Sequence, residues 1–308
     1  MLSIKTLDVE INKNGQNYLV SNNSITGTSL EVLSFMSSGI KKRSGSGTSE
    51  GRPGRINYYS EDDYRTITMT VEATAEDMQD IAHLRDAVNE LFDGEMFIRE
   101  MRIKDIKIEY ERPGERTGEL QLEAPEYVNG KQIKVDKVNS IEIDDTTLKS
   151  VFMVEFETTD LPYFESIYTT LELHDSGYAH SAEKYGLVDN IDDEKVQYRF
   201  TESNFTVYNA GNVTVEPESM ELVIQISNTS TSGTLSLKNI TTGEEFRLTK
   251  SLSERHISLR GMNILDGTVN AFRDSNRRLI SLAPGDNRFE ISGATFSEVW
   301  FRFKYYYK

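Results

Sequence analysis

The first half of the chain alternates apolar and polar side chains, which is the pattern of half-buried β-strands. In the segment TITMTVEA, every second residue from Ile67 to Ala73 is apolar. Similar alternation occurs in MFIREMRIKDIKIEYE, KQIKVDKVNSIEI and SVFMVEFET. The pair Asn14-Gly15, between LDVEIN and YLVS, favours a tight hairpin turn. These segments predict an N-terminal sheet.

One amphipathic helix is predicted between Thr74 and Asp93. Thr74 is expected to be its N-cap, and Gly94 is expected to end it. The apolar residues at helical spacing are Met78, Ile81, Leu84, Val88, Leu91 and Phe92. This stripe is expected to cover the sheet, so the N-terminal domain is predicted to be α+β with one main helix. His83 lies off the stripe and is expected on the surface.

Beyond about Tyr168 the pattern changes to short strands joined by turns, and no helix is predicted. The predicted strands are MELVIQIS, GTLSLKNI, EEFRLTK, RHISLRG, RRLISL, NRFEIS and VWFRFKYYY. Turn signals between them include Thr242-Gly243, Asp266-Gly267 and Pro284-Gly285, and Asn287 is expected to cap the last of these turns. The sequence therefore predicts a mainly β protein with an N-terminal domain, 1–168, and an all-β C-terminal sandwich, 169–308.

The last predicted strand carries several aromatic residues. Strict alternation places Val299, Phe301, Phe303, Tyr305 and Tyr307 on the core face. Trp300 and Tyr306 then belong to the solvent face. There, flat rings are suited to stacking on sugar rings or to contacting another protein.

Composition and charge narrow the class of protein. The 308 residues include no cysteine, and 34 Lys and Arg against 50 Asp and Glu give a formal net charge of −16. This charge disfavours nucleic-acid binding, because neutralisation of phosphates supplies most of that affinity. No segment approaches the roughly 20 apolar residues that cross a bilayer, and no signal peptide is recognisable. We expect a soluble protein that is made in a reducing cytoplasm and does not insert into membranes.

No motif indicates catalysis or a cofactor. The separation of His174 and His180 suits no metal site, and the chain has no Gly-x-Ser-x-Gly motif. Acidic clusters such as Glu61-Asp62-Asp63 are typical of solvated turns, although a glycosidase needs only two carboxylates. We expect no enzyme, no cofactor and no metal, with a glycosidase as an open alternative.

A basic, glycine-rich segment between Ser38 and Arg55 contrasts with the acidic chain. Its cations are Lys41, Lys42, Arg43, Arg52 and Arg55. Its glycines have neither the spacing of a Walker A loop nor the third glycine of a dinucleotide-binding loop. Two interpretations stay open: a mobile surface loop, or an arm whose cations contact an acidic surface in an assembly.

Several segments together resemble a family of phage proteins. In the N-terminal half they are the glycine-rich segment with GRPGR, the strand RTITM, the single helix and VEFETTDLPYFES. In the C-terminal half they are YNAGNVTVEPESMELVI, NITTGEEFRL and LAPGDNRFEI. Over nearly its whole length the chain is similar to the distal tail proteins (Dit) of siphophages that infect Gram-positive bacteria.

The resemblance implies a structural virion protein at the distal end of the phage tail. It implies a homohexameric ring of N-terminal domains, through which the genome passes without specific binding, and outward C-terminal domains that are galectin-like or carbohydrate-module-like. The implied neighbours are the tail tube protein, the tape-measure protein, the tail-associated lysin, and receptor-binding or baseplate proteins. A lumen for DNA is expected to be acidic or neutral, with the cations of the basic segment directed away from it. The alternative is a carbohydrate-binding adhesion module that recognises host glycans.

Overall fold

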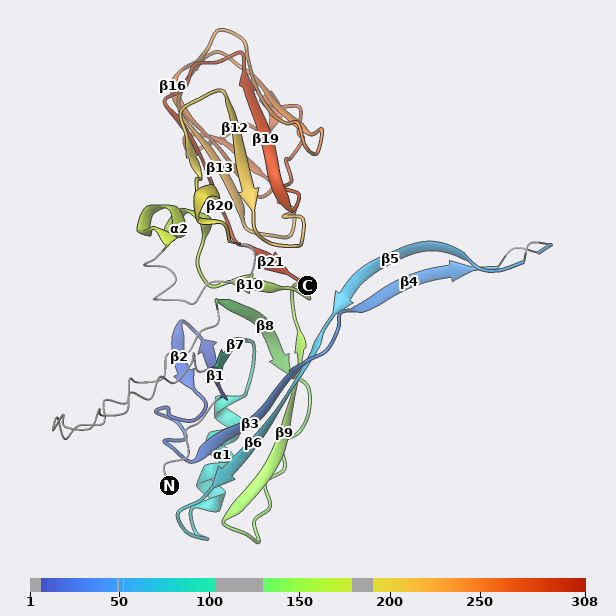
Figure 1. The fold of residues 1–308 in the computed structure, drawn as a ribbon, viewed down its shortest axis with the longest axis vertical. Helices are drawn as coiled ribbons and strands as arrows, with labels where there is room; N and C mark the ends of the chain where they lie inside the picture. The colour runs from blue at the N-terminus through green and yellow to red at the C-terminus, as the bar shows by residue number, and fades with distance from the viewer. Residues whose placement is uncertain (1–6, 49, 52, 103–129, 179–190) are drawn as a thin grey trace, which may run out of the picture. The chain divides into compact units, whose positions relative to one another are not determined.

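The computed structural model of the protein describes residues 7–48, 50–51, 53–102, 130–178 and 191–308. These residues divide into two compact units, an N-terminal unit that ends at Phe164 and a C-terminal unit that begins at Glu165. Figure 1 shows strands throughout both units, and the prediction of a mainly β protein is confirmed. The division lies a little before Tyr168 because Ser166 already belongs to the C-terminal unit, where its N–H donates to the Tyr305 carbonyl at 2.9 Å.

The N-terminal unit is an antiparallel sheet with one helix. Its elements are β1 (Leu7–Lys13), β2 (Gln16–Leu19), β3 (Leu30–Ser37), β4 (Lys41–Gly47), β5 (Ile56–Tyr64), β6 (Thr66–Thr74), α1 (Ile81–Leu91), β7 (Met96–Arg102), β8 (Lys131–Lys137) and β9 (Lys149–Thr158). The main sheet has the strand order β2-β1-β7-β8-β9-β6-β3, while β4 and β5 pair as a separate ribbon. The part of the predicted strand that follows Arg102 lies outside the described residues.

The predicted hairpin between β1 and β2 is confirmed. Asn14 and Gly15 have φ values of 53° and 77°, the left-handed conformation that a two-residue turn of type I′ requires at both positions. The register pairs Lys13 with Gln16 directly across the turn. The Asn-Gly signal was therefore sufficient to locate this turn.

The core of the N-terminal unit lies between α1 and one face of the sheet. The helix contributes Ile81, Leu84, Val88 and Leu91, all buried. The strands contribute alternate residues, including Val9, Ile11, Ile67, Met69, Val71, Ile98, Ile133, Val135, Val154 and Phe156. The Phe92 ring meets the Phe156 ring edge to face, with centroids 6.2 Å apart. Period two on the strands and period 3.6 on the helix thus meet in one apolar layer.

The helix α1 starts later than predicted. Thr74 is not its N-cap; it ends β6, and its N–H donates to the Ser29 carbonyl, just before β3, at 2.8 Å. The Asp77 carboxylate accepts two backbone N–H groups, at 2.7 and 3.0 Å, and forms a turn before the helix. Met78 lies in this turn and is 52% exposed, so it does not belong to the buried stripe. Gly94, with φ of 77°, follows the helix as predicted.

The C-terminal unit is a sandwich of two antiparallel sheets. Its elements are β10 (Phe164–Ser166), α2 (Thr170–Ser176), η1 (Asp193–Lys195), β11 (Arg199–Phe200), β12 (Asn204–Asn209), β13 (Leu222–Thr231), β14 (Thr234–Asn239), β15 (Glu245–Thr249), β16 (Leu252–Arg260), β17 (Asn263–Asp266), β18 (Val269–Asn270), η2 (Phe272–Asp274), β19 (Gly285–Ser292), β20 (Glu298–Phe303) and β21 (Tyr306–Tyr307). One sheet has the order β11-β20-β13-β16-β17-β18 and the other β12-β19-β14-β15.

Phenylalanine rings join the two sheets of the sandwich. Phe205 and Phe289 come from one sheet, and Phe301 comes from the other. The centroid of Phe301 lies 5.8 Å from that of Phe205 and 4.9 Å from that of Phe289. Phe200 stacks on Phe205 at 4.5 Å. Alternation along each strand directs these rings inward, where they form the centre of the core.

The C-terminal unit differs from the prediction in several elements, and the short strands β11, β12, β17 and β18 were among those missed. The helix α2 was missed, although Thr169 and Glu172 form a capping box at its start. It is too short for a helical period to be visible in the sequence. The predicted strand RRLISL is not a strand, because Arg277 is left-handed, with φ of 58°, and only Leu282 makes an isolated bridge, to Val215. Within the described ranges, neither α-helix is long and apolar enough to span a membrane.

Candidate assembly surfaces

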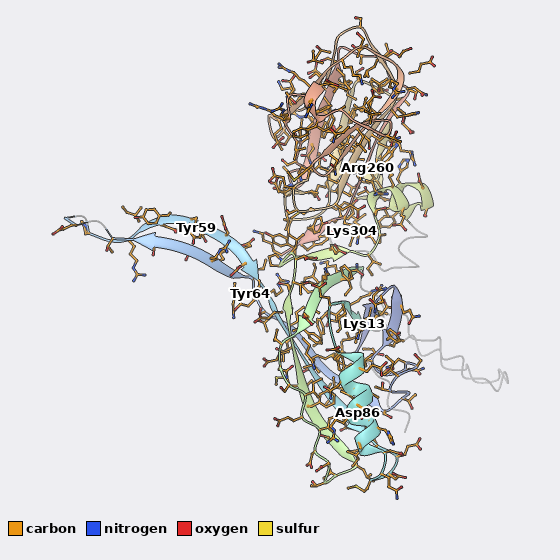
Figure 2. The ribbon with its side chains drawn as sticks, turned by 180° about the vertical axis from the view of Figure 1, so that it is seen from behind. Lys13, Tyr59, Tyr64, Asp86, Arg260 and Lys304 are labelled. Carbon is orange, nitrogen blue, oxygen red and sulfur yellow. The ribbon has the colours of Figure 1, made fainter. Side chains whose placement is uncertain are left out.

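The basic, glycine-rich segment is part of a β-hairpin. β4 follows β3 and β5 precedes β6, so the hairpin continues two neighbouring strands of the main sheet. Figure 1 shows this two-stranded ribbon leaving the sheet, and Figure 2 shows Tyr59 and Tyr64 along it. The interpretation as a surface loop is therefore wrong for residues 41–47, which pair with β5. We call residues 38–64 the arm.

Two of the predicted contact cations are paired within the arm. Lys42 lies 3.7 Å from Asp62, and Arg43 donates to Glu61 at 3.1 Å. The register of the ribbon sets Lys42 opposite Asp62 and Arg43 opposite Glu61. Strand pairing thus brings the basic strand against the acidic one, and a contact of these exposed cations with another molecule stays a prediction. The cluster from Glu61 to Asp63 correspondingly lies in a strand and not in the expected turn.

The remaining cations of the arm differ in their surroundings. Lys41 donates to the Tyr64 hydroxyl at 2.6 Å, and its ammonium lies over that ring, 4.4 Å from the centroid. This hydrogen bond raises the pKa of Lys41. Arg55 is exposed near the turn of the arm. Arg52 lies outside the described residues.

The inner end of the arm is anchored to the N-terminal unit. The Tyr163 hydroxyl donates to the Asp62 carboxylate at 2.9 Å. Burial, together with this carboxylate, raises the pKa of Tyr163 to about 12. Arg65 is only 5% exposed, and its guanidinium lies 5.0 Å from the centroid of the Phe164 ring. Burial lowers the pKa of Arg65. The arm is thus fixed at its base and solvated along its length.

The face of β3, β6 and β9 opposite the core is an open surface. On β6 it carries threonines at alternate positions, with Glu72 among them. Four apolar side chains on the neighbouring strands are between 46% and 57% exposed: Leu33, Met36, Val151 and Met153. Lys149 on this face forms a 2.6 Å ion pair with Glu72. We call this surface the threonine face.

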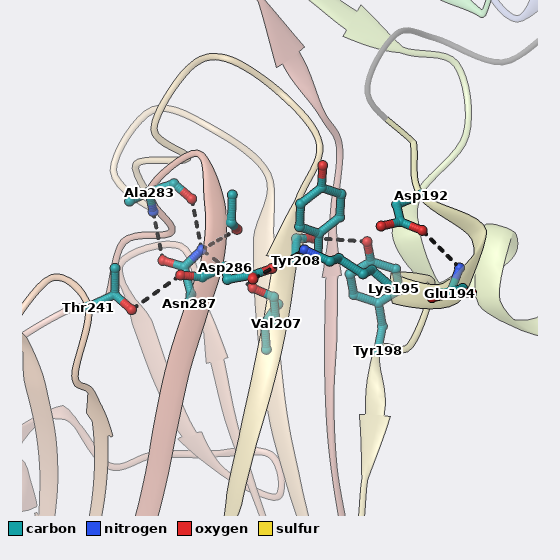
Figure 3. A network of polar contacts seen from close by, with 11 residues as sticks. Asp192, Glu194, Lys195, Tyr198, Val207, Tyr208, Thr241, Ala283, Asp286 and Asn287 are labelled. Atoms are coloured by element: carbon teal, nitrogen blue, oxygen red, sulfur yellow. Dashed lines mark hydrogen bonds and ion pairs between the residues drawn. The ribbon is translucent and has the colours of Figure 1, made fainter.

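Polar side chains hold the turns at one end of the C-terminal unit (Figure 3). The fully buried Asn287 side chain accepts from the Ala283 N–H at 2.9 Å and donates to the carbonyls of Ala283 and Gly285 at 2.7 and 3.1 Å. Gly285 has φ of 82°, as the turn after Pro284 requires. The prediction that Asn287 caps this turn is confirmed.

The same network ties η1 to the sandwich. Lys195 donates to the Asp286 carboxylate at 3.1 Å and lies 4.9 Å from the centroid of the Tyr208 ring. The hydrogen bond to Asp286 raises the pKa of Lys195. Tyr198 donates to the Tyr208 carbonyl at 2.9 Å, and Thr241 donates to the Asp286 carbonyl at 3.3 Å. These contacts are internal, so Figure 3 shows a structural network.

The predicted aromatic surface at the end of the chain does not form. Tyr306 is only 3% exposed, and its hydroxyl accepts from the Glu221 N–H at 3.2 Å. The alternation fails because β20 ends at Phe303 and β21 begins only at Tyr306. Trp300 keeps a partly exposed position beside Arg199 of β11. The expectation of two exposed rings is therefore wrong for Tyr306.

The C-terminal unit has a cleft of about 450 Å³. It is lined by Glu216, Pro217, Glu218, Thr242, Gly243, Glu244, Met262, Phe272, Arg277, Arg278, Leu279 and Ser281. Glu244 accepts from the Ser281 N–H at 2.7 Å and from its hydroxyl at 2.8 Å. Burial raises the pKa of Glu216, and the charges of Glu244 and Glu218 raise it further. Acceptors, guanidinium donors and the Phe272 ring together suit a polar ligand that has an apolar face.

The histidines within the described part of the chain form no recognisable site. His83 is exposed, as predicted, and His174 lies with Nδ1 3.3 Å from the Val196 carbonyl. His180 is outside the described residues. Among the residues that the structure describes, no group of three or more His, Cys, Asp and Glu side chains could hold a metal ion.

The comparisons with known proteins place the fold. No protein-family model and no curated protein sequence matches the chain. The crystal structure of the Dit protein of phage SPP1 (gp 19.1) covers 98% of this chain and 100% of its own, with a TM-score of 0.58 and 12% identity. The chain has the fold of that protein. SPP1 Dit is described as a paradigm of the hub of the adsorption apparatus in phages that infect Gram-positive bacteria.

Two structures of the phage P2 baseplate in its activated conformation, with Ca and with Sr, are also similar. They cover 97% of this chain and 98% and 97% of their own chains, with TM-scores of 0.40 and 0.39 and identities of 11% and 10%. The likeness to SPP1 Dit supports the resemblance that the sequence indicated, at the level of fold.

The sequence did not point to two features that the structure brings out. Tyr58 and Tyr59 carry no local signal, because their surroundings depend on the register between β4 and β5. The cleft draws Glu216, Glu244 and Arg277 from segments far apart in the chain. The left-handed Arg277 has no turn signal in its sequence, so only the fold reveals it.

Proposed function

We propose that the protein is a structural component of a phage tail, a distal tail protein that joins the tail tube to the tail tip or baseplate. One observation carries this proposal: the likeness to SPP1 Dit extends over both units, from end to end of both chains. A likeness confined to a single sandwich would fit many unrelated functions. The protein has no catalytic role in this proposal.

In this function the chain assembles into a homohexameric ring through its N-terminal domain. A closed ring uses heterologous contacts, in which one surface meets a different surface on the next copy. The arm supports such a contact, because it is anchored at Asp62 and Arg65 and extends from the main sheet as a separate two-stranded ribbon with exposed side chains. The role of the arm as an inter-subunit contact belongs to the proposal.

A ring of this kind needs a central channel, or lumen, through which DNA moves without binding to its wall. The threonine face meets that need, because its side chains are hydroxyls, carboxylates and apolar groups, and Lys149 is neutralised by Glu72. Unpaired cations at such a surface would bind the phosphates and slow the passage of the genome. We therefore assign this face to the lumen.

The remaining neighbours follow from the position of the ring. We propose contacts with the tail tube protein, the tape-measure protein and the tail-associated lysin, while the C-terminal domain supports receptor-binding or baseplate proteins. The protein is then found in the virion, at the distal end of the tail, after synthesis in the cytoplasm of the bacterial host.

Particle shape and mass test the proposal. Negative-stain microscopy and mass measurement of the full chain at high concentration, and of isolated tail tips, should reveal a six-membered ring. A strict monomer in both settings would contradict it. A ring with another number of copies would keep the hub and revise its symmetry.

A second candidate function is sugar binding by the C-terminal unit. The buried position of Tyr306 removes the predicted aromatic strip, but the cleft with Phe272 and Glu216 favours a site of this kind. A glycan array probed with the full chain, and with Phe272→Ala as the control variant, separates this function from a purely structural one. Turnover of a bound cell-wall glycan would instead indicate a glycosidase.

A further inference from the structure

The arm has two unlike faces because of a β-bulge. Gly45 pairs with Tyr59, but the next residue of β4, Ser46, pairs with Asn57, so Tyr58 is an extra residue on β5. Tyr58 is 67% exposed and Tyr59 is 46% exposed. These rings are the large exposed hydrophobic side chains of the described part of the arm. The face of the ribbon to which they point therefore decides which face can bind another protein.

Both tyrosine rings lie over glycines of the facing strand. A Cβ added at Gly45 would overlap the Tyr59 ring, and a Cβ added at Gly47 would lie 2.6 Å from the Tyr58 hydroxyl. Gly45 and Gly47 are two residues apart on a strand, so their missing side chains would point to the same face. Both rings therefore occupy one face of the ribbon, in the space that the glycines leave open.

The other face of the arm is wholly polar. Cross-strand partners share a face, and here the pairs are Lys42 with Asp62, Ser44 with Ser60 and Ser46 with Asn57. The ribbon thus has one side that carries both rings, next to the pair Arg43–Glu61, and one side without an aromatic residue. Such an arrangement suits one contact surface and one solvent surface.

The charge of the arm limits its partner. Between Ser38 and Tyr64 five cations stand against four carboxylates, while the whole chain has a net charge of −16. Two copies of so acidic a chain repel each other over most of their surface. The arm is a segment with which one copy can approach the acidic surface of another.

We propose that the aromatic face of the arm, formed by Tyr58 and Tyr59, docks on a second copy of this chain. The inference rests on the proposed ring and names the contact that holds the arm. A two-stranded ribbon without a second layer is only marginally stable in water, so a surface that covers one face stabilises it. Tyrosine suits this role because its ring buries a large area while its hydroxyl stays hydrated. The paired cations Lys42 and Arg43 contribute little to the contact.

Sedimentation equilibrium of the full chain tests the docking. The double variant Tyr58→Ser/Tyr59→Ser should weaken self-association about tenfold or more, because buried aromatic anchors dominate interfaces. The matched variant Tyr58→Phe/Tyr59→Phe keeps the rings and should stay within about threefold of the unaltered chain. Thermal unfolding of each variant shows whether the fold is preserved, and its midpoint should be unchanged.

Glycine variants test the geometry without removing a ring. Gly45→Ala forces Tyr59 from its position and should weaken self-association in the same direction as the double variant. Gly39→Ala is the control, because no atom lies within 4 Å of the added Cβ. Equal association of these two alanine variants would overturn the assigned position of the contact.

A photo-cross-linking residue in place of Tyr58 identifies the partner. Cross-links to another copy of this chain are expected, both with purified protein and in isolated tail tips. Cross-links only to other tail proteins would overturn the inference. If rings form and the serine variants do not weaken them, the inference about the arm fails while the proposed function stands. A monomer in every setting would contradict both the inference and the proposed function.

Discussion

The arm and the turns of the C-terminal unit are built from similar residues but use them in opposite ways. In the sandwich, Asn209, Asn239 and Asn287 are at most 1% exposed. Their carboxamides bind the backbone of neighbouring segments, as in the bond from Asn239 to the Ser281 carbonyl at 3.0 Å. In the arm, Ser44, Ser46, Ser60 and Asn57 face water, and the ion pairs Lys42–Asp62 and Arg43–Glu61 join the two strands of the ribbon.

The difference follows from the presence or absence of a second layer. A hairpin that is covered by another sheet must satisfy its buried polar groups internally, and its turns become rigid. A hairpin that lacks a covering sheet has no core of its own and leaves its apolar side chains available. The C-terminal unit accordingly has a core of its own, whereas the arm gains a covered face only through the contact proposed above.

The core of the sandwich should show the largest effect. Phe301→Ala removes a ring that contacts Phe205 and Phe289, and it should destabilise the C-terminal unit by about 3 to 5 kcal/mol. Trp300, the single tryptophan, reports on this unit, so its fluorescence during urea unfolding provides the measurement. An unchanged midpoint would contradict the aromatic core.

The helix stripe tests the core of the other unit. Leu91→Ala should cost about 2 to 5 kcal/mol because Leu91 is fully buried against the sheet. Hydrogen exchange of α1 measures the loss, while the Trp300 transition should stay in place. Met78→Ala is the control, and its cost should be close to zero because Met78 is exposed. Equal costs for the two variants would remove α1 from the core.

The contrast between buried and exposed asparagines can be measured directly. Asn287→Ala leaves the N–H of Ala283 and the carbonyls of Val207, Ala283 and Gly285 without this partner, and it should cost about 1 to 3 kcal/mol. Asn57→Ala on the arm should stay within about 0.5 kcal/mol. Urea unfolding followed through Trp300 gives the first value, and hydrogen exchange of the arm gives the second. A large loss of stability in Asn57→Ala would mean that polar contacts within the arm hold its structure without a partner.

Acid should weaken the C-terminal unit through Asp266. Burial alone would raise the pKa of this carboxyl, but hydrogen bonds and charges from Lys250 and Arg255 outweigh burial and lower it. A lowered pKa contributes stability above the unfolded value of about 3.9, which is lost as the pH falls through the lower folded value. Asp266→Asn should therefore flatten the dependence of unfolding on pH below about 4. The exposed variant Asp193→Asn should leave this dependence intact.

The smallest effect is expected at the ion pairs of the arm. Arg43→Ala should leave the stability of the N-terminal unit nearly unchanged, because its pair with Glu61 is exposed to solvent. It should also leave self-association nearly unaltered, in contrast to the tyrosine variants. Differential scanning calorimetry and sedimentation equilibrium measure the two quantities. A strong loss of association would mean that the cations of the arm, and not its tyrosines, make the contact between copies.

The sequence by itself determined the features whose signals are local. Alternation located β6 and β9, the turn pair Asn14-Gly15 located the first hairpin, and the helical spacing from Ile81 to Leu91 located the stripe of α1. The turn at Gly285 with its Asn287 cap was also readable, because the bonds that close the turn, to Ala283 and Gly285, lie within four residues. Such patterns depend on the geometry of one short segment.

Only the tertiary structure decided which surfaces are exposed and which charges are paired. Lys42 meets Asp62 across twenty residues, and the bulge at Tyr58 turns two tyrosines to one face of the arm. The alternation that should have exposed Tyr306 stops where β20 ends. The physical reason is that a period assigns faces within a strand, whereas register, bulges and strand ends are set by pairing with distant segments.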